Sequence, residues 1–223
     1  MQKPDQKPAT PGAQQVRGRG RPRAFDREAA LTQATRLFWC KGYEATSITE
    51  LTEAMGIGSP SLYAAFGSKE ALYAEALSHY VHTYEALVWG RFRTARTARE
   101  AVEAFLKDSA TALTGSVTDI PRGCMVTLSS VGNEGHAELG DLVRSARAGT
   151  LESLQACLER AMGAGELPAS TNVRALSRFV QTVQNGMSIL ARDGASREEL
   201  DAVADIAMAG WDARIAKSMV DDV

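Results

Sequence analysis

Residues 47–66 read SITELTEAMGIGSPSLYAAF, and this stretch decides the fold. Ser47, with a glutamate three residues later, has the pattern of a capping box and predicts the start of a short helix. Gly56-Ile57-Gly58 predicts a tight turn, and Ser59 followed by Pro60 is typical of the start of a second helix. Two short helices joined by such a turn form a helix-turn-helix, whose second helix enters the major groove of duplex DNA.

The outward-facing residues of the second helix are small and polar. The hydroxyls of Ser59 and Ser61 can reach base edges or phosphates, and the hydroxyl of Tyr63 can hydrogen-bond a phosphate. Lys69 follows in the first turn of the next helix, where the positive end of the helix dipole also favours a phosphate. The apolar residues of the segment predict a small core made by Ile48, Leu51, Met55, Ile57, Leu62 and Phe66.

The sequence on both sides of this segment has helical periodicity. Asp26 is a suitable N-cap for a helix that Gly42 ends, and Ser68 is one for a helix that continues toward Trp89. No stretch of useful length alternates as a strand does, and we find no internal repeat, so we predict an all-α fold. Further helices are expected over 98–114, 122–131, 136–163, 171–192 and 196–217.

Residues 1–23 differ from the rest of the chain in composition and charge. They are rich in Pro, Gly, Gln and Arg and carry a net charge of +5, against −7 over the remaining residues. We expect this basic arm to be disordered in isolation. Its last part, Arg17-Gly18-Arg19-Gly20-Arg21-Pro22-Arg23, is similar to an AT-hook and suits insertion of arginines into a narrow minor groove. The alternative is a solubilising tail with general attraction to phosphates.

The composition excludes several other classes of protein. The 223 residues are 44% hydrophobic, enough for a small domain joined to a larger one. The chain has no run of about 18 apolar residues and no signal peptide, and its three cysteines are too widely spaced for a disulfide framework. His79 and His82 lie one turn apart but lack a third ligand. We therefore expect a cytoplasmic protein without a membrane partner, a metal site or a cofactor.

Residues 25–73, FDREAALTQATRLFWCKGYEATSITELTEAMGIGSPSLYAAFGSKEALY, resemble the DNA-binding domain of the TetR/AcrR family of transcriptional regulators. The resemblance implies an N-terminal three-helix DNA-binding domain over 24–70 and a larger helical ligand-binding and dimerisation domain over 71–223. It also implies a homodimer that binds a palindromic operator. By position it marks as DNA-facing Thr46, Ser47, Thr49, Ser59, Pro60, Ser61, Tyr63 and Lys69.

The second helix of the motif departs from the family pattern at Ala64 and Ala65, where a basic or an aromatic residue is frequent. Alanine offers no hydrogen bond to a base edge. We therefore expect modest direct base contact, with specificity that depends on half-site spacing and on the basic arm.

The predicted helices over 171–192 and 196–217 have broad apolar stripes. They offer more apolar surface than one packed face needs, so we expect them to pair with the same helices of a second chain; packing within one core is the alternative. The resemblance also implies a mostly apolar ligand cavity in the body. Asn185 is a further polar candidate, and the main candidate lining residues are Trp89, Phe92, Phe105, Cys124, Met125, Leu128, Phe179, Gln181, Val183, Gln184 and Met187.

Cys124 follows Arg122 at the predicted start of a helix, where the helix dipole and the guanidinium favour a thiolate. A regulator that senses redox state or electrophiles through Cys124 is therefore one alternative. An inert, buried cysteine is the other.

The sequence favours a ligand-responsive transcriptional repressor that a small, largely apolar effector releases from DNA. The main alternative is an architectural DNA-binding protein without an effector, which predicts a filled body. An activator is a further alternative, because activation depends on where the operator lies. No GxSxG, HExxH, P-loop or dinucleotide motif is present, so we predict no enzymatic activity.

Overall fold

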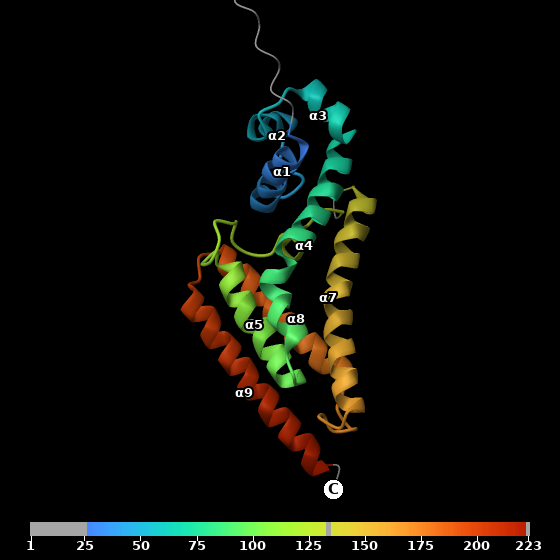
Figure 1. The fold of residues 1–223 in the computed structure, drawn as a ribbon, viewed down its shortest axis with the longest axis vertical. Coiled ribbons are helices and arrows are strands. Elements are labelled where there is room, and N and C mark those ends of the chain that lie inside the picture. Colours follow the sequence, from blue (N-terminus) through green and yellow to red (C-terminus); the bar gives the residue numbers. More distant parts are fainter. Residues whose placement is uncertain (1–25, 133–134, 222–223) are drawn as a thin grey trace, which may run out of the picture.

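The computed structural model describes residues 26–132 and 135–221, and all regular structure in these two ranges is helical (Figure 1). The all-α prediction is therefore confirmed. The basic arm, with its four arginines, lies outside the described residues. The helices are α1 (Arg27–Lys41), α2 (Ile48–Met55), α3 (Ser59–Phe66), α4 (Lys69–Thr94), α5 (Ala98–Leu113), α6 (Met125–Leu128), α7 (Ala137–Gly163), α8 (Val173–Arg192) and α9 (Arg197–Asp221).

Side-chain caps fix where the first helices begin and end. The Asp26 carboxylate accepts hydrogen bonds from two backbone N–H groups of α1. Ser47 and Glu50 form the complete capping box of α2, and Gly56 ends that helix in the left-handed region with φ +66°. Ser68 caps α4 through the N–H of Ala71. These contacts are local, so the sequence alone was enough to predict them.

Three helices differ from the prediction: α6, α4 and α9, the last of which runs to Asp221 instead of residue 217. The expected helix over 122–131 shrinks to the four residues of α6, because Gly123 takes a φ of +78° that a right-handed helix cannot contain. A Cβ at Gly123 would lie 2.9 Å from the Ser188 carbonyl oxygen, so only glycine fits against α8. Helix α4 continues past Trp89 to Thr94.

The chain buries its apolar side chains in two clusters. The first joins α1, α2 and α3, here called the head, to the first half of α4, to α6 and to the start of α7. The second lies in the body, between the end of α4, α5, the second half of α7, α8 and α9. Helix α4 contributes to both clusters and runs from the head into the body in Figure 1. Among the described residues, no helix is long and apolar enough to cross a membrane.

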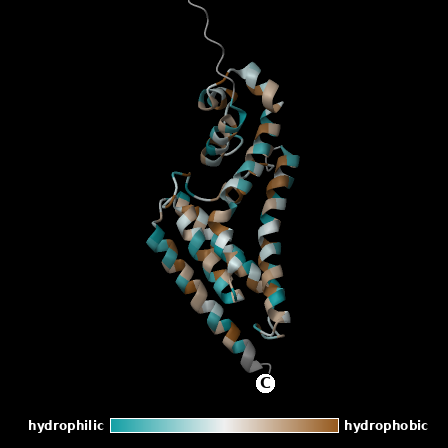
Figure 2. Ribbon diagram, in the orientation of Figure 1, coloured by the Kyte–Doolittle hydropathy of each residue, from teal (hydrophilic) through white to brown (hydrophobic). Residues whose placement is uncertain are grey.

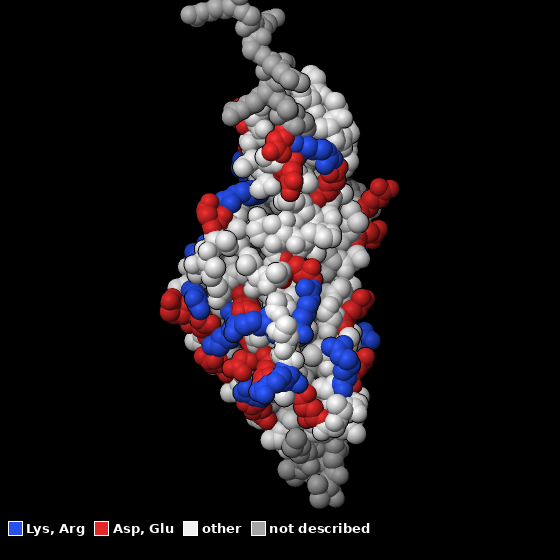
Figure 3. Space-filling view, viewed as in Figure 1, with Lys and Arg blue, Asp and Glu red and all other residues white. Residues whose placement is uncertain are grey.

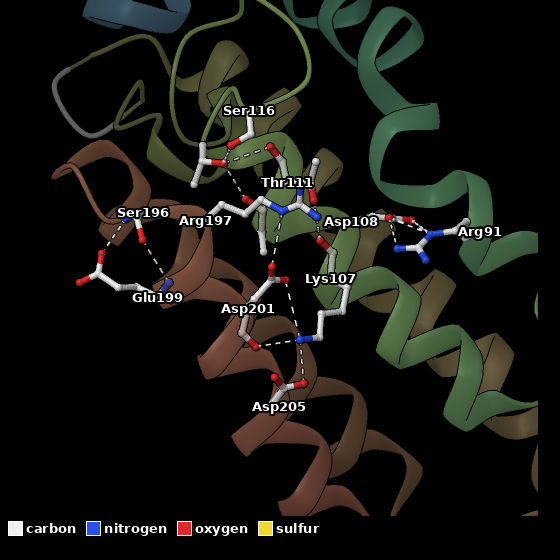
Figure 4. A network of polar contacts seen from close by, with 12 residues as sticks. Arg91, Lys107, Asp108, Thr111, Ser116, Ser196, Arg197, Glu199, Asp201 and Asp205 are labelled. Atoms are coloured by element: carbon white, nitrogen blue, oxygen red, sulfur yellow. Dashed lines mark hydrogen bonds and ion pairs between the residues drawn. The ribbon is translucent and has the colours of Figure 1, made fainter.

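Polar contacts hold α4, α5 and α9 together at the surface of the body (Figure 4). Lys107 of α5 lies 2.7 Å from the Asp205 carboxylate of α9, and Arg91 of α4 pairs with Asp108 of α5. Such exposed pairs contribute only about 0–1 kcal/mol each. The body is therefore held mainly by the apolar faces of its helices, and Figure 2 shows hydrophobic and hydrophilic residues mixed along each of them.

Candidate DNA-binding head and effector cavity

The head presents α3 on its outer surface. Leu62 and Phe66 pack into the head core with Leu51 of α2, which fixes the angle between the two helices. The opposite side of α3 is left exposed, including the Tyr63 side chain at 47% exposure. The exposed residues that were predicted to face DNA are Ser47, Thr49, Ser59, Pro60, Ser61 and Tyr63.

Two predicted DNA-facing residues have partners inside the head. Thr46 is only 1% exposed, and its hydroxyl donates to the Gly42 carbonyl at 2.6 Å. The surface role expected of Thr46 is therefore wrong, because its hydroxyl is hydrogen-bonded within the short connection between α1 and α2. Lys69 is half-buried, with its ammonium 4.2 Å from the centre of the Tyr43 ring, a cation–π contact that holds it at the start of α4.

The electrostatics of the head are unusual for a surface that meets DNA. Residues 26–70 contain four basic and six acidic residues, and neither α2 nor α3 contains a lysine or arginine. The surface over α3 is accordingly uncharged in Figure 3. Lys41 pairs with Glu50, and this hydrogen bond is the main reason that the pKa of Glu50 falls to about 2. Within the described residues, the motif thus offers hydroxyls and backbone N–H groups to DNA phosphates, rather than positive charge.

The body contains a cavity of about 610 Å³. One wall is aromatic and comes mostly from α4 and α5, whereas α7 and α8 supply most of the polar groups. Of the predicted lining residues, those that line it are Trp89, Phe92, Phe105, Cys124, Gln181, Gln184 and Asn185. An architectural protein needs no such cavity, and a filled core over these helices would have favoured that alternative.

Five predicted lining residues lie outside this cavity. Met125 is buried in the first apolar cluster, Met187 is buried in the second, and Val183 packs against the second. Leu128 lies against Gly123 instead, because the short α6 turns it away from the position that a longer helix would give it. Phe179 is 42% exposed and lines a separate groove of about 400 Å³ between α8 and α9, together with Trp211.

Several lining residues were missed by sequence reasoning. Tyr80 and Tyr84 of α4 and Trp39 of α1 line the cavity and contact one another in edge-on or tilted geometry, with ring centroids 4.7–5.6 Å apart. The available signal was the i, i+4 spacing of Tyr80 and Tyr84 on α4, but the same spacing is typical of an ordinary core stripe. Arg147 of α7 was missed as well, since a lone arginine in a polar helix gives no indication of a cavity.

The polar groups of the cavity are satisfied unevenly. The Gln181 amide donates to the Arg147 carbonyl at 2.9 Å, and Thr127 donates to the Asn185 carbonyl oxygen at 3.1 Å. Burial raises the pKa of Tyr80 well above its usual value, so its hydroxyl keeps the proton that it donates to the Cys124 sulfur at 3.3 Å. Gln184 is 7% exposed, and its amide has no hydrogen-bond partner among the described residues.

A set of hydrogen bonds ties the end of α1 to the body. The indole N–H of Trp39 donates to the Gly123 carbonyl at 2.8 Å. From α8, the Arg192 guanidinium donates to the carbonyls of Trp39, Cys40 and Arg122 at 2.8–3.0 Å. We call Trp39, Gly123 and Arg192 the junction. It secures the carbonyls at the end of α1, which no residue within that helix can satisfy.

These features define a helix-turn-helix DNA-binding protein with a hollow helical body. Residues 30–76 match the family model described as bacterial regulatory proteins, tetR family. The chain is 36% identical over 207 residues to the HTH-type transcriptional repressor ComR of Escherichia coli K12, a match that covers 91% of this chain and 97% of ComR. The chain belongs to the TetR family of transcriptional regulators.

Other relatives agree with this assignment. The HTH-type transcriptional repressor BdcR of Escherichia coli K12 is 34% identical over 196 residues, which cover 88% of this chain and 93% of BdcR. A solved cysteine mutant of the TetR family regulator CifR, complexed with 26-bp operator DNA, has a TM-score of 0.79 at 39% identity and covers 85% of this chain and 98% of that one. These relatives are named as regulators, which agrees with the prediction that the chain is not an enzyme.

The junction gives a first testable prediction. Replacing Arg192 by methionine keeps the aliphatic part of the side chain but removes the donors to three carbonyls. We expect the free energy of unfolding, measured by denaturant titration, to fall by about 1–3 kcal/mol. The control is Arg144→Met, because Arg144 pairs with the exposed Asp141 and should contribute less than about 1 kcal/mol. Equal losses in the two variants would contradict a specific role for Arg192.

Proposed function

We propose that this protein is a ligand-responsive repressor that binds a palindromic operator as a homodimer and leaves it when a small molecule occupies the body. The observation that carries the proposal is the cavity of about 610 Å³ behind the head. Its size and its apolar walls are those of a site for one small molecule. Two relatives, ComR and BdcR, are named repressors, which supports repression rather than activation. The CifR mutant is bound to operator DNA, which supports operator binding.

The DNA-facing set of this proposal is the exposed part of the motif together with Lys69. The hydroxyls of Ser59 and Ser61 and the phenol of Tyr63 contact DNA from α3, while Ser47 and Thr49 contact phosphates from the start of α2. A two-fold dimer places the two α3 helices about 34–36 Å apart, in successive turns of the major groove.

Apolar side chains on α8 and α9 support the homodimer. Ile189 and Leu190 of α8 and Ile206 of α9 are each 46–75% exposed, and Phe179 lies in the groove between the two helices. Exposed apolar side chains gathered on one pair of helices are typical of a protein interface. The same helices from a second chain would cover them.

The route from cavity to head passes through Trp39. This residue belongs to α1 of the head, lines the cavity and donates to Gly123, whose neighbour Cys124 lines it too. An effector that displaces the indole changes the position of α1, and with it the spacing of the two heads. The effector needs only to bind the displaced state more tightly by a few kcal/mol.

Selection of bound DNA from a random duplex library tests the proposal. We expect enrichment of one palindrome, and release of that site by some members of a small-molecule panel that also raise the melting temperature of the protein. A site that no cavity ligand releases would favour the architectural alternative. The absence of any enriched sequence would contradict operator binding itself.

The basic arm gives a separate prediction. Because α2 and α3 carry no cation, we expect deletion of residues 1–23 to weaken operator binding and to reduce the slope of log affinity against log salt by about 0.9 per lost phosphate contact. Fluorescence anisotropy at several salt concentrations measures both. A variant with Arg17, Arg19, Arg21 and Arg23 changed to lysine keeps the charge, so it should keep the slope but lose preference for A·T-rich flanks. Unchanged affinity and slope after the deletion would reject the arm as a DNA contact.

A second candidate function is the sensing of electrophiles through Cys124. The observation that favours it is the place of this half-buried thiol in the cavity wall, where a bound molecule would meet it. N-ethylmaleimide, to which a thiol adds across the C=C bond, should then release the operator from the parent protein, which keeps Cys124 and Cys157, and from a Cys157→Ser control, but not from Cys124→Ser. Exposed Cys40 is changed to serine in all three proteins. Release from the Cys124→Ser variant would reject this function.

A further inference from the structure

We infer that the effector of this cavity is a flat apolar molecule that carries one acidic group, such as a carboxylate. The inference rests on the proposed function and names the chemical class of its ligand. Three features carry it: an aromatic wall, an arginine without a carboxylate partner, and a cavity-lining amide without a hydrogen bond to the described residues.

The aromatic wall selects the apolar part of the ligand. Trp89 lies against Phe92 and Phe105 with ring centroids 4.7–4.8 Å apart, and Tyr80 and Tyr84 continue the wall toward the head. Aromatic side chains contact a flat ring system over a large area at a low cost in conformational entropy. A planar hydrocarbon part of two or three rings suits this wall and the volume of the cavity.

Arg147 provides charge on the other side of the cavity. Its Nε donates to the Val126 carbonyl at 3.1 Å, and its Nη2 donates to the carbonyls of Thr127 and Ser129. These bonds hold the guanidinium in place but leave its charge uncompensated, and Nη1 makes no hydrogen bond with the described residues. A fixed guanidinium with a free edge is a typical partner for a carboxylate.

The other charged residues of the wall do not cancel this charge. Glu85 is the acidic lining residue, and it pairs with Arg93. Arg160 adds a further positive charge at the rim and forms no ion pair with the described residues. The lining therefore carries a surplus of positive charge, which opposes a cationic ligand even though aromatic walls can bind cations.

Gln184 completes the polar side. It lies on α8 one turn beyond Gln181, whose amide contacts the backbone of Arg147. The Gln184 amide faces the cavity and has no hydrogen-bond partner among the described residues, so a ligand can accept its N–H bond. Arg147 and Gln184 together offer donors from two helices, and an acidic group is the acceptor that satisfies both.

Three naphthalene probes with one skeleton test the charge of the ligand. Calorimetric titration compares 1-naphthoate, 1-naphthamide and 1-naphthylmethylammonium against the full-length protein. We expect naphthoate to bind about tenfold more tightly than the amide, and the ammonium to bind more weakly than the amide. Equal affinities, stronger binding of the ammonium, or no binding of any probe would overturn the inference.

A matched pair of variants locates the binding. Gln184→Glu places a carboxylate in the cavity. The affinity for naphthoate should fall about tenfold, whereas the affinity for naphthamide should stay within about twofold. Asn172→Asp makes the same amide-to-acid change in the groove between α8 and α9, where the aspartate still caps α8. This variant should bind naphthoate and naphthamide with unchanged affinity. Loss of naphthoate binding in Asn172→Asp would place the anion in that groove and overturn the inference.

Operator release separates this inference from the proposed function. If the amide binds and releases the operator as well as naphthoate does, the ligand class is wrong and the repressor stands. If naphthoate binds preferentially, and molecules that occupy the cavity leave the operator bound, the ligand class stands and effector control fails.

Discussion

The hydrogen bond from the Trp39 indole to the Gly123 carbonyl is the contact on which the relation between head and body depends. The indole is 4% exposed, so an unpaired N–H there would be costly, and Gly123 must accept the bond from a backbone conformation that favours glycine. Arg192 then secures the carbonyls at the end of α1 from the side of α8. Helix α4 joins the two parts covalently and the first apolar cluster packs them together, while this junction adds directional hydrogen bonds between them.

The head could be predicted from sequence because its determinants are local. The Ser47 capping box, the left-handed Gly56 and the Ser68 cap each act within a few residues. Thr46 shows the limit of this reasoning: a hydroxyl beside a helix-turn-helix suggests a phosphate contact, yet it donates to a carbonyl four residues earlier. The family position alone does not distinguish the two roles.

The body was predicted as a set of helices, but its cavity was predicted only in part. Trp89, Phe92 and Phe105 lie on two consecutive helices, where periodicity indicates a shared face. Trp39 and Arg147 reach the cavity only through tertiary packing, which no local pattern encodes. Phe179 and Met187 were misplaced because periodicity indicates which residues share the apolar side of α8, but not whether each of them meets the cavity, the core or the groove beside α9.

Charge and cavity together suggest a division of labour along the chain. Helix α3, the proposed recognition helix, carries no charged side chain, so its proposed affinity depends on geometry: on hydroxyls and N–H groups that reach DNA only when the two heads are correctly spaced. A head held by strong charge would tolerate some misplacement, because Coulomb attraction falls slowly with distance at low salt. A head that relies on short hydrogen bonds does not tolerate it. Under the proposed mechanism, a small displacement of α1 at Trp39 would be enough to weaken binding, and a cavity wall formed partly by the head suits that mechanism.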